Sequence, residues 1–307
     1  MLSFPLWHAR FRDHMQMAGW TARSVGSYLG ELRRLFAFLE EQKVTSISEV
    51  QLDILEAWRL ELFYQETDGK RLTLRTQAWR LGVVRAFFRY LIAAGYILSD
   101  PMTRVPQLRV PKLLPRVLLS EEETVRLMES PPTDEPLGLR DRAMLELLYG
   151  TGIRNTELRL LTLEEVDLER RELRIRCGKG NKSRVLPLGE EAWGWLVAYL
   201  TEARSHLVRG REQHLVFVSY KGNRLTRACL GHRVAKAAKA AGLEKPVTPH
   251  VLRHCCATHM LARGAGIRHL QMLLGHESLS TTQRYTRVDV SDLHAVVARC
   301  HPREAQP

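Results

Sequence analysis

The sequence is poor in cysteine and has no long apolar run. Its five cysteines are an odd number without regular spacing, which argues against a disulfide framework and favours reduced thiols. No stretch reaches the roughly eighteen uninterrupted apolar residues that a membrane span requires. Charged residues interrupt the first twenty positions, so no secretory leader is expected. These absences predict a soluble, cytoplasmic chain without a membrane partner.

Motifs for metals and nucleotides are also lacking. The phosphate-loop pattern GxxxxGK[ST] does not occur, and no carboxylate cluster of the kind that magnesium nucleases need is visible. One segment rich in histidine and cysteine leaves a zinc site open as an alternative, although it lacks paired ligand spacing; it contains His250, His254, Cys255, Cys256 and His259. The sequence therefore predicts no bound metal and no cofactor.

Acidic residues are outnumbered by basic ones. Lysine and arginine total 46 against 34 aspartates and glutamates, which gives a net charge of +12 and an isoelectric point near 9.8. A basic excess of this size favours a polyanionic partner such as a nucleic acid. The alternative is a charge that serves only solubility.

Residues 1–100 read as a helical domain. Apolar residues recur every three or four positions within 24–42, 47–66 and 72–96, as they do on one face of an amphipathic helix. The third segment is expected to carry arginines on its polar side, either as a solvated face or as a stripe that follows phosphates: Arg71, Arg75, Arg80, Arg85 and Arg89.

A change of texture at 101–118 marks an extended, basic linker. Prolines at 101, 106, 111 and 115 disfavour helix, because proline lacks a backbone donor and restricts the residue before it. Basic residues lie between these prolines, and we expect Arg104, Arg109 and Lys112 to contact DNA phosphates.

Residues 119–300 predict a second domain that is mainly helical. Ser120 and Glu123 form the pattern of a capping box at the start of a helix. Residues 171–188 alternate apolar and charged side chains around a glycine-rich turn, which predicts a β-hairpin. The expected fold class is therefore mainly α with a small antiparallel sheet, an α+β second domain, and a loose tail over 301–307.

Several basic residues in this domain lie where a phosphate is well received. Thr248 and Pro249 predict a helix start, and His250 and Arg253 then share one face near its positive end. Arg154 follows a glycine break at another helix start. Further on, the sequence LGH is followed nine residues later by a tyrosine in TTQRYT.

The strings HVLRH, LGH and TTQRYT resemble the signature boxes of the tyrosine recombinases, the phage integrase family, and of their Xer type in particular. The resemblance covers nearly the whole chain and implies a helical, SAM-like core-binding domain, a linker and a catalytic domain. It implies six catalytic residues and one supporting acid: Arg154, Lys179, His250, Arg253, His276, Tyr285 as nucleophile, and Glu157 in support. The usual serine two residues after the first arginine is here Thr156, which favours a mobile-element relative.

The resemblance implies a site-specific recombinase that cuts DNA through a 3′-phosphotyrosyl intermediate and a Holliday junction. Two arginines donate to the phosphate oxygens, His250 is the candidate base, and Lys179 the candidate acid for the leaving 5′-oxygen. His276 is expected to hydrogen-bond the scissile phosphate. The reaction is expected to need neither metal nor ATP.

The resemblance also implies an assembly. The partner would be double-stranded DNA with a specific site, bound by a homo-tetramer or by a hetero-tetramer with a second recombinase. The apolar face of the last helix, over 288–302, would pack on its own core or dock on a neighbouring subunit. Two other functions remain open, a type IB topoisomerase and a DNA-binding relative without catalysis.

Overall fold

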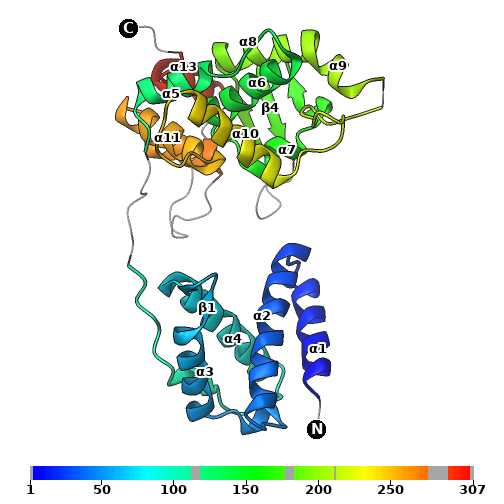
Figure 1. Cartoon of the computed structure of the whole chain (residues 1–307), viewed down its shortest axis with the longest axis vertical. Helices are drawn as coiled ribbons and strands as arrows, with labels where there is room; N and C mark the ends of the chain where they lie inside the picture. Colours follow the sequence, from blue (N-terminus) through cyan, green and yellow to red (C-terminus); the bar gives the residue numbers. More distant parts are fainter. Residues whose placement is uncertain (1–2, 112–117, 177–182, 211, 276–289, 305–307) are drawn as a thin grey trace. The chain divides into compact units, whose positions relative to one another are not determined.

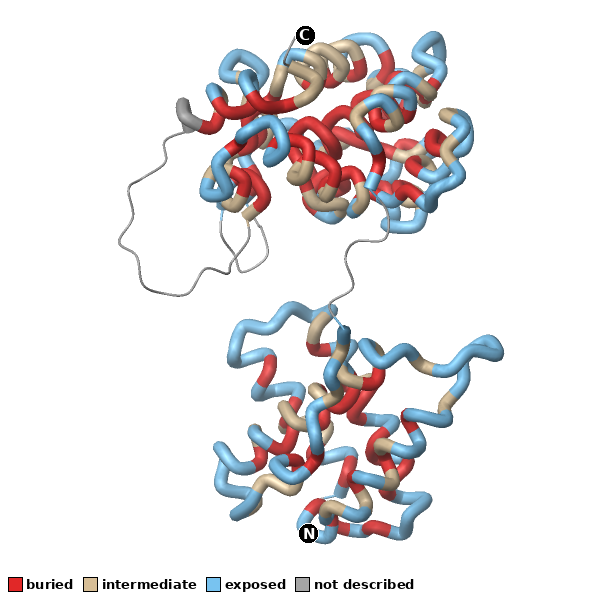
Figure 2. The backbone as a smooth tube through the Cα atoms, turned by 90° about the vertical axis from the view of Figure 1, so that its left-hand side faces the viewer, coloured by how far each residue is buried: buried red, intermediate tan, exposed pale blue. Residues whose placement is uncertain are grey.

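The computed structural model describes residues 3–111, 118–176, 183–210, 212–275 and 290–304. The chain divides into two compact units, Met1–Leu114 and Pro115–Pro307, drawn from blue to cyan and from green to red in Figure 1. This division falls inside the stretch 101–118 that its prolines mark as a linker. Each unit has its own apolar core, visible as the buried residues in Figure 2.

The N-terminal unit consists mainly of four helices. These are α1 (Phe4–Met17), α2 (Ala22–Glu41), α3 (Leu52–Tyr64) and α4 (Leu74–Ala93), with the short 3₁₀ turns η1 (Ile47–Glu49) and η2 (Pro101–Thr103) and the small hairpin β1 (Glu66–Thr67) and β2 (Lys70–Arg71). Thr21 and Thr73 cap α2 and α4 by accepting hydrogen bonds from backbone N–H groups three residues on. Leu32, Leu35 and Phe87 are fully buried where these helices pack together.

The structure corrects the predicted basic stripe at two positions. Arg80 was expected on the polar face, but it is 6% exposed, lies 3.4 Å from the buried carboxylate of Glu31 and donates to the side chain of Gln65. A buried carboxylate needs a cation or donors nearby, and Arg80 satisfies this need within the core. Arg71 lies on β2 and not within the helix.

The other three arginines of the stripe lie on α4. Arg75 and Arg89 are exposed. Arg85 is half-buried and donates from Nη2 to the carbonyl of Val105 at 3.1 Å, which fastens the segment after α4 onto the helix. Two exposed guanidinium groups, about four helical turns apart, therefore remain on this helix.

The first part of the predicted linker is packed rather than free. Met102 and Val105 are buried in the core of the N-terminal unit. Arg104 and Arg109 are exposed, as expected of residues that would contact DNA, whereas Lys112 lies outside the described residues. Proline prevents a regular helix here, but the apolar residues between the prolines still bury their side chains.

The C-terminal unit contains most of the helices and a three-stranded sheet. Its helices are α5 (Glu121–Glu129), α6 (Pro136–Gly150), α7 (Asn155–Leu160), α8 (Glu190–Ala198), the π-helical η4 (Tyr199–Ala203), α9 (Arg204–Val208), α10 (Arg227–Ala240), α11 (Pro249–Ala262), α12 (Ile267–Leu274) and α13 (Val290–Cys300). The strands, in antiparallel order after the turn η3 (Leu163–Glu165), are β3 (Val166–Asp167), β4 (Glu172–Ile175) and β5 (Arg184–Pro187). The expected fold class, mainly α with a small antiparallel sheet, is confirmed.

Helix α6 lies at the centre of this unit and is buried along most of its length. The predicted capping box at α5 is present, since Ser120 accepts from the N–H of Glu123 and the carboxylate of Glu123 accepts from the N–H of Ser120. The four cysteines among the described residues are free thiols. Within the described ranges, no helix is long and apolar enough to cross a membrane.

The expected loose tail is wrong for residues 301–304. His301 is 1% exposed and its ring lies 3.3 Å from the carbonyl of Tyr149. Arg303 donates from Nη2 to Glu146 at 2.8 Å and to Glu191 at 3.0 Å. The buried acid on α6 thus acquires a cation from the chain end, and this ion pair anchors the segment.

The apolar face of α13 packs on its own unit in this structure. Val296, Val297 and Cys300 are buried in the core that also contains residues of α6 and α11, and Leu293 is buried as well. Of the two expectations for this helix, packing in its own core is therefore the one that the isolated chain displays. Together with the anchored segment 301–304, α13 therefore packs on the C-terminal unit, to which it belongs.

We expect Arg303→Met to lower the free energy of unfolding of the C-terminal unit by about 3 kcal/mol. Glu146 is fully buried and would keep only its ion pair with Arg142, at 3.0 Å, so part of the cost of burying its charge would be uncompensated. Urea unfolding followed by circular dichroism measures the change. Arg299→Met, an exposed position on α13, is the control and should change stability by less than about 0.5 kcal/mol.

Candidate active site

Arg154 stands at a sharp corner between α6 and α7. The chain turns at Gly152, whose φ of +61° is in the left-handed region, and a Cβ there would lie 2.7 Å from the side chain of Leu274. Thr151 closes the corner, because its hydroxyl donates to the carbonyl of Leu147 and accepts from the N–H of Ile153. The predicted glycine break before Arg154 is confirmed, and it places Arg154 at the N-cap of α7.

Glu157 is the acceptor around which this corner is organised. It is 8% exposed, and its carboxylate accepts from the backbone N–H of Arg154 at 2.9 Å and from Nη1 of the same residue at 2.8 Å. The side chain of Arg154 is thereby held back against its own helix. It remains 25% exposed, so the guanidinium can still be reached from solvent.

Arg184, which the sequence analysis did not single out, grips the same carboxylate. From the start of β5 it donates through Nη1 and Nη2 to the two oxygens of Glu157, at 2.8 and 2.7 Å. Its Nε also donates to the carbonyl of Leu273 at 3.2 Å. In the sequence, the only indication of a role for Arg184 is that it lies five residues after the predicted Lys179. Basic residues are common in hairpins, so this position alone does not mark Arg184 as a site residue.

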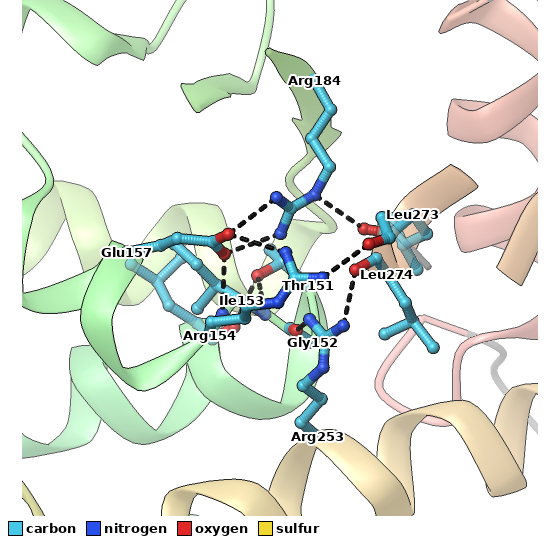
Figure 3. A network of polar contacts seen from close by, with 11 residues as sticks. Thr151, Gly152, Ile153, Arg154, Glu157, Arg184, Arg253, Leu273 and Leu274 are labelled. Carbon is cyan, nitrogen blue, oxygen red and sulfur yellow. Dashed lines mark hydrogen bonds and ion pairs between the residues drawn. The ribbon is translucent and has the colours of Figure 1, made fainter. Parts of the chain in front are cut away.

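Arg253 approaches from α11, where Thr248 and Pro249 begin the helix as predicted. It is 6% exposed and donates from Nη1 to the carbonyl of Gly152 and from Nη2 to the carbonyl of Leu274, the latter at 2.5 Å. Figure 3 shows its guanidinium beside that of Arg154, with Glu157 on one side and the end of α12 on the other.

The three guanidinium groups bind three successive carbonyls, those of the last two residues of α12 and that of its C-cap residue Gly275. Arg184 donates to Leu273, Arg253 to Leu274, and Arg154 to Gly275 at 2.5 Å. Carbonyls at a helix end lack partners within the helix and carry partial negative charge, so cations are favourable there. Gly275 has a left-handed backbone conformation, with a φ of +61°, and a Cβ at this position would lie 3.2 Å from the side chain of Arg184.

The electrostatics of this cluster are dominated by burial and by the opposed charges. Desolvation alone would raise the pKa of Glu157, but hydrogen bonds and charge from Arg184, followed by the donors of Arg154, lower it to about 2. Burial and the neighbouring guanidinium groups of Arg154 and Arg184 lower the pKa of Arg253 to about 10. Three cations therefore face one carboxylate, which leaves an excess of positive charge for an anion.

The histidines of α11 have different surroundings. His250 is exposed at the second position of the helix, one turn before Arg253. Burial and the nearby His250 lower the pKa of His254. His259 is buried, with Nδ1 2.9 Å from the hydroxyl of Tyr149 and Nε2 2.9 Å from the carbonyl of Leu119. Both its nitrogens are engaged, and no group of three or more metal-binding side chains occurs among the described residues.

Three of the predicted catalytic residues lie outside the described residues, namely Lys179, His276 and Tyr285. The structure brings together Arg154, Glu157 and Arg253, which were predicted, and Arg184, which was not. Paired guanidinium groups with charge-assisted donors are suited to the non-bridging oxygens of a phosphodiester.

Comparison with known proteins identifies the family of this chain. Residues 118–292 match the model of the phage integrase family. The chain is 41% identical over 280 residues to tyrosine recombinase XerD of Pseudomonas putida, which covers 90% of each protein. It is 39% identical over 295 residues to tyrosine recombinase XerC 2 of Ralstonia nicotianae, which covers 96% of this chain and 85% of the relative.

Among solved structures, a lambda integrase tetramer bound to a Holliday junction superposes with a TM-score of 0.68. The match covers 94% of this chain and 81% of the integrase at 16% identity, which shows the fold alone.

The fold and these relatives define a DNA strand-exchange enzyme, a site-specific tyrosine recombinase. The chain belongs to the phage integrase family, and its likeness to the Xer type is confirmed.

We expect Glu157→Gln to destabilise the protein by about 3 kcal/mol at pH 7. The folded-state pKa near 2 lies below the ordinary value of 4.5, so the ionised carboxylate stabilises the fold above about pH 4.5 and loses this effect as the pH falls towards 2. The difference between wild type and variant should therefore shrink between about pH 5 and pH 3 in urea unfolding.

Glu164→Gln provides the control, since that carboxylate is exposed. Its difference from wild type should be small at every pH. A Glu157→Gln penalty that stays constant from pH 7 to pH 3 would contradict the proposed charge state of Glu157.

Proposed function

We propose that this tyrosine recombinase cuts DNA with Tyr285 as the nucleophile and that Arg154 and Arg253 bind the scissile phosphate. The observation that carries the proposal is the convergence of these two guanidinium groups from different helices on one set of acceptor oxygens. In the chain without DNA, the Nη2 groups of Arg154 and Arg253 donate to backbone carbonyl oxygens. A phosphodiester oxygen, with more negative charge, would take their place.

The reaction balances as a transfer of the phosphoryl group. The Tyr285 hydroxyl loses its proton, its oxygen bonds to phosphorus, and the bond from phosphorus to the 5′-oxygen breaks, leaving a 3′-phosphotyrosine. Charge develops on the phosphate oxygens during attack, and one preorganised donor typically contributes about 2.7–4 kcal/mol to the transition state. The 5′-hydroxyl of the partner strand later reverses the step and reseals the DNA.

Two residues that lie close in sequence to the arginines of the site are proposed to transfer protons, His250 before Arg253 and Lys179 before Arg184. His250, exposed at the N-terminus of α11, is the proposed base, because a tyrosine hydroxyl with a pKa near about 10 is otherwise a poor nucleophile. Lys179 is the proposed acid for the 5′-oxygen, and His276 is proposed to hydrogen-bond the phosphate.

The N-terminal unit is proposed to be the core-binding domain, over 1–100, with 101–118 as the linker and 119–300 as the catalytic domain. Exposed basic residues support a phosphate-contacting surface on α4 and the following segment: Arg75, Arg89, Arg104 and Arg109. The proposed partner is double-stranded DNA with a specific site, in the cytoplasm. A tetramer is proposed by analogy with the lambda integrase tetramer on a Holliday junction.

We expect Tyr285→Phe to abolish covalent attachment to DNA and to preserve binding, because only the attacking oxygen is removed. Nicked suicide duplexes, drawn from DNA that flanks the gene, would be incubated with protein and EDTA and then run on denaturing gels. Binding by both proteins would be compared by fluorescence anisotropy.

An adduct that persists in Tyr285→Phe would overturn the assignment of the nucleophile. An adduct that forms only without EDTA would overturn the metal-free reaction. Relaxation of supercoiled DNA without strand exchange between two duplexes would favour the topoisomerase. Tight binding without any adduct would favour a non-catalytic relative.

We expect Arg75→Ala and Arg89→Ala together to reduce the dependence of DNA affinity on salt. Each lost phosphate contact lowers the slope of log affinity against log salt by about 0.9, so the double variant should lose about 2. Arg80→Met on the same helix is the matched control, because Arg80 is buried and should leave the slope unchanged where the variant remains folded. An unchanged slope in the double variant would place the DNA on another surface.

A further inference from the structure

Arg184 lies at the meeting point of three elements that the proposed reaction uses. It begins β5, grips Glu157 on α7 through both Nη atoms, and contacts the end of α12 through Nε. The same hairpin carries the proposed Lys179 five residues earlier in the sequence, and α12 leads directly to His276. One side chain therefore joins the segments to which three of the proposed catalytic residues belong in the sequence, Arg154, Lys179 and His276.

The orientation of Arg184 distinguishes it from Arg154. Its Nη1 and Nη2 face the carboxylate of Glu157 in a bidentate pair, and its side chain is only 11% exposed. Arg154, in contrast, is 25% exposed and directs Nη2 to the carbonyl of Gly275. Arg184 thus donates both of its Nη groups to the carboxylate of Glu157, and the same carboxylate accepts a hydrogen bond from Nη1 of Arg154.

Glu157 needs this second cation to hold Arg154 well. A carboxylate with most of its surface buried costs free energy unless it is paired and hydrogen-bonded. Arg154 supplies one side-chain donor and one backbone donor, whereas Arg184 supplies two side-chain donors to the two oxygens. Without Arg184, each carboxylate oxygen would keep one donor from Arg154, and the buried charge would lose half of its hydrogen bonds and one of its two paired cations. The carboxylate would then hold the guanidinium of Arg154 less firmly.

We propose that Arg184 is a positioning residue for DNA cleavage, which acts through Glu157 to fix the guanidinium of Arg154 against the scissile phosphate. This inference rests on the proposed function. It assigns Arg184 no contact with the DNA. A guanidinium suits this role better than the ammonium group of lysine, because its planar pair of donors matches both oxygens of a carboxylate.

The test is a double-mutant cycle on the full-length protein. Arg184→Met, Glu157→Gln and the double variant are compared with wild type in the rate of adduct formation on a nicked suicide duplex, at saturating protein. DNA affinity and the melting temperature are measured for each, and the assay is run below the lowest melting temperature. Arg174→Met is the matched control: it lies on β4 of the same hairpin, is exposed, and pairs with Asp167 at 2.6 Å.

We expect Arg184→Met to slow cleavage by about 10²–10³-fold, the typical loss for one misplaced transition-state donor. DNA affinity should change by less than about threefold. Because Arg184 acts through Glu157, the double variant should be no slower than the slower single variant. Arg184→Lys should recover part of the rate, and Arg174→Met should cleave as wild type does.

Other outcomes overturn the inference. Losses that multiply in the double variant would mean that Arg184 acts independently of Glu157, for example by touching the phosphate. If DNA affinity and cleavage rate decrease together, in proportion to the decrease in melting temperature, Arg184 has a structural role only. Wild-type rates in Arg184→Met would remove any role in cleavage. If wild type itself forms no adduct on a duplex that it binds, the proposed function fails first, and the inference with it.

Discussion

The C-terminal unit depends on how the buried carboxylate of Glu157 is neutralised. Removing a carboxylate from water is costly, and here four donors from two arginines compensate for it. Those donors come from α7 and from β5, which are far apart in sequence. The need to satisfy one charge therefore fixes the sheet against the helix that begins at Arg154. The guanidinium groups of Arg154, Arg184 and Arg253 also donate hydrogen bonds to the carbonyls at the end of α12.

The end of α12 completes the arrangement because its unpaired carbonyls face the guanidinium groups. Gly152 and Gly275 make this approach possible: each adopts a left-handed conformation, and a side chain at either position would meet a neighbour in the cluster. Further along the chain, α13 and Arg303 are fixed to the same unit. Both described ends that flank residues 276–289 are thus held by the unit that contains the arginines.

Local patterns allowed much of this to be predicted. Helix caps such as Ser120, the glycine corner before Arg154 and the hairpin follow from rules that act over a few residues. The errors concern pairings over long distances. Arg80 looks like a surface residue until the buried Glu31 is placed beside it, and Arg184 is separated from Glu157 by 27 positions. Nothing in a short window reveals which basic residue will neutralise a buried acid.

The contacts between the arginines and the carbonyls have a consequence for the entropy of DNA binding. Arginine side chains carry about 2 kcal/mol of rotamer entropy, which is lost when they are fixed. In Arg154 and Arg253 much of that freedom is already lost in the folded chain without DNA. A phosphate that reaches these guanidinium groups therefore exchanges one acceptor for another and has little ordering to impose, so that more of the contact energy can appear as affinity.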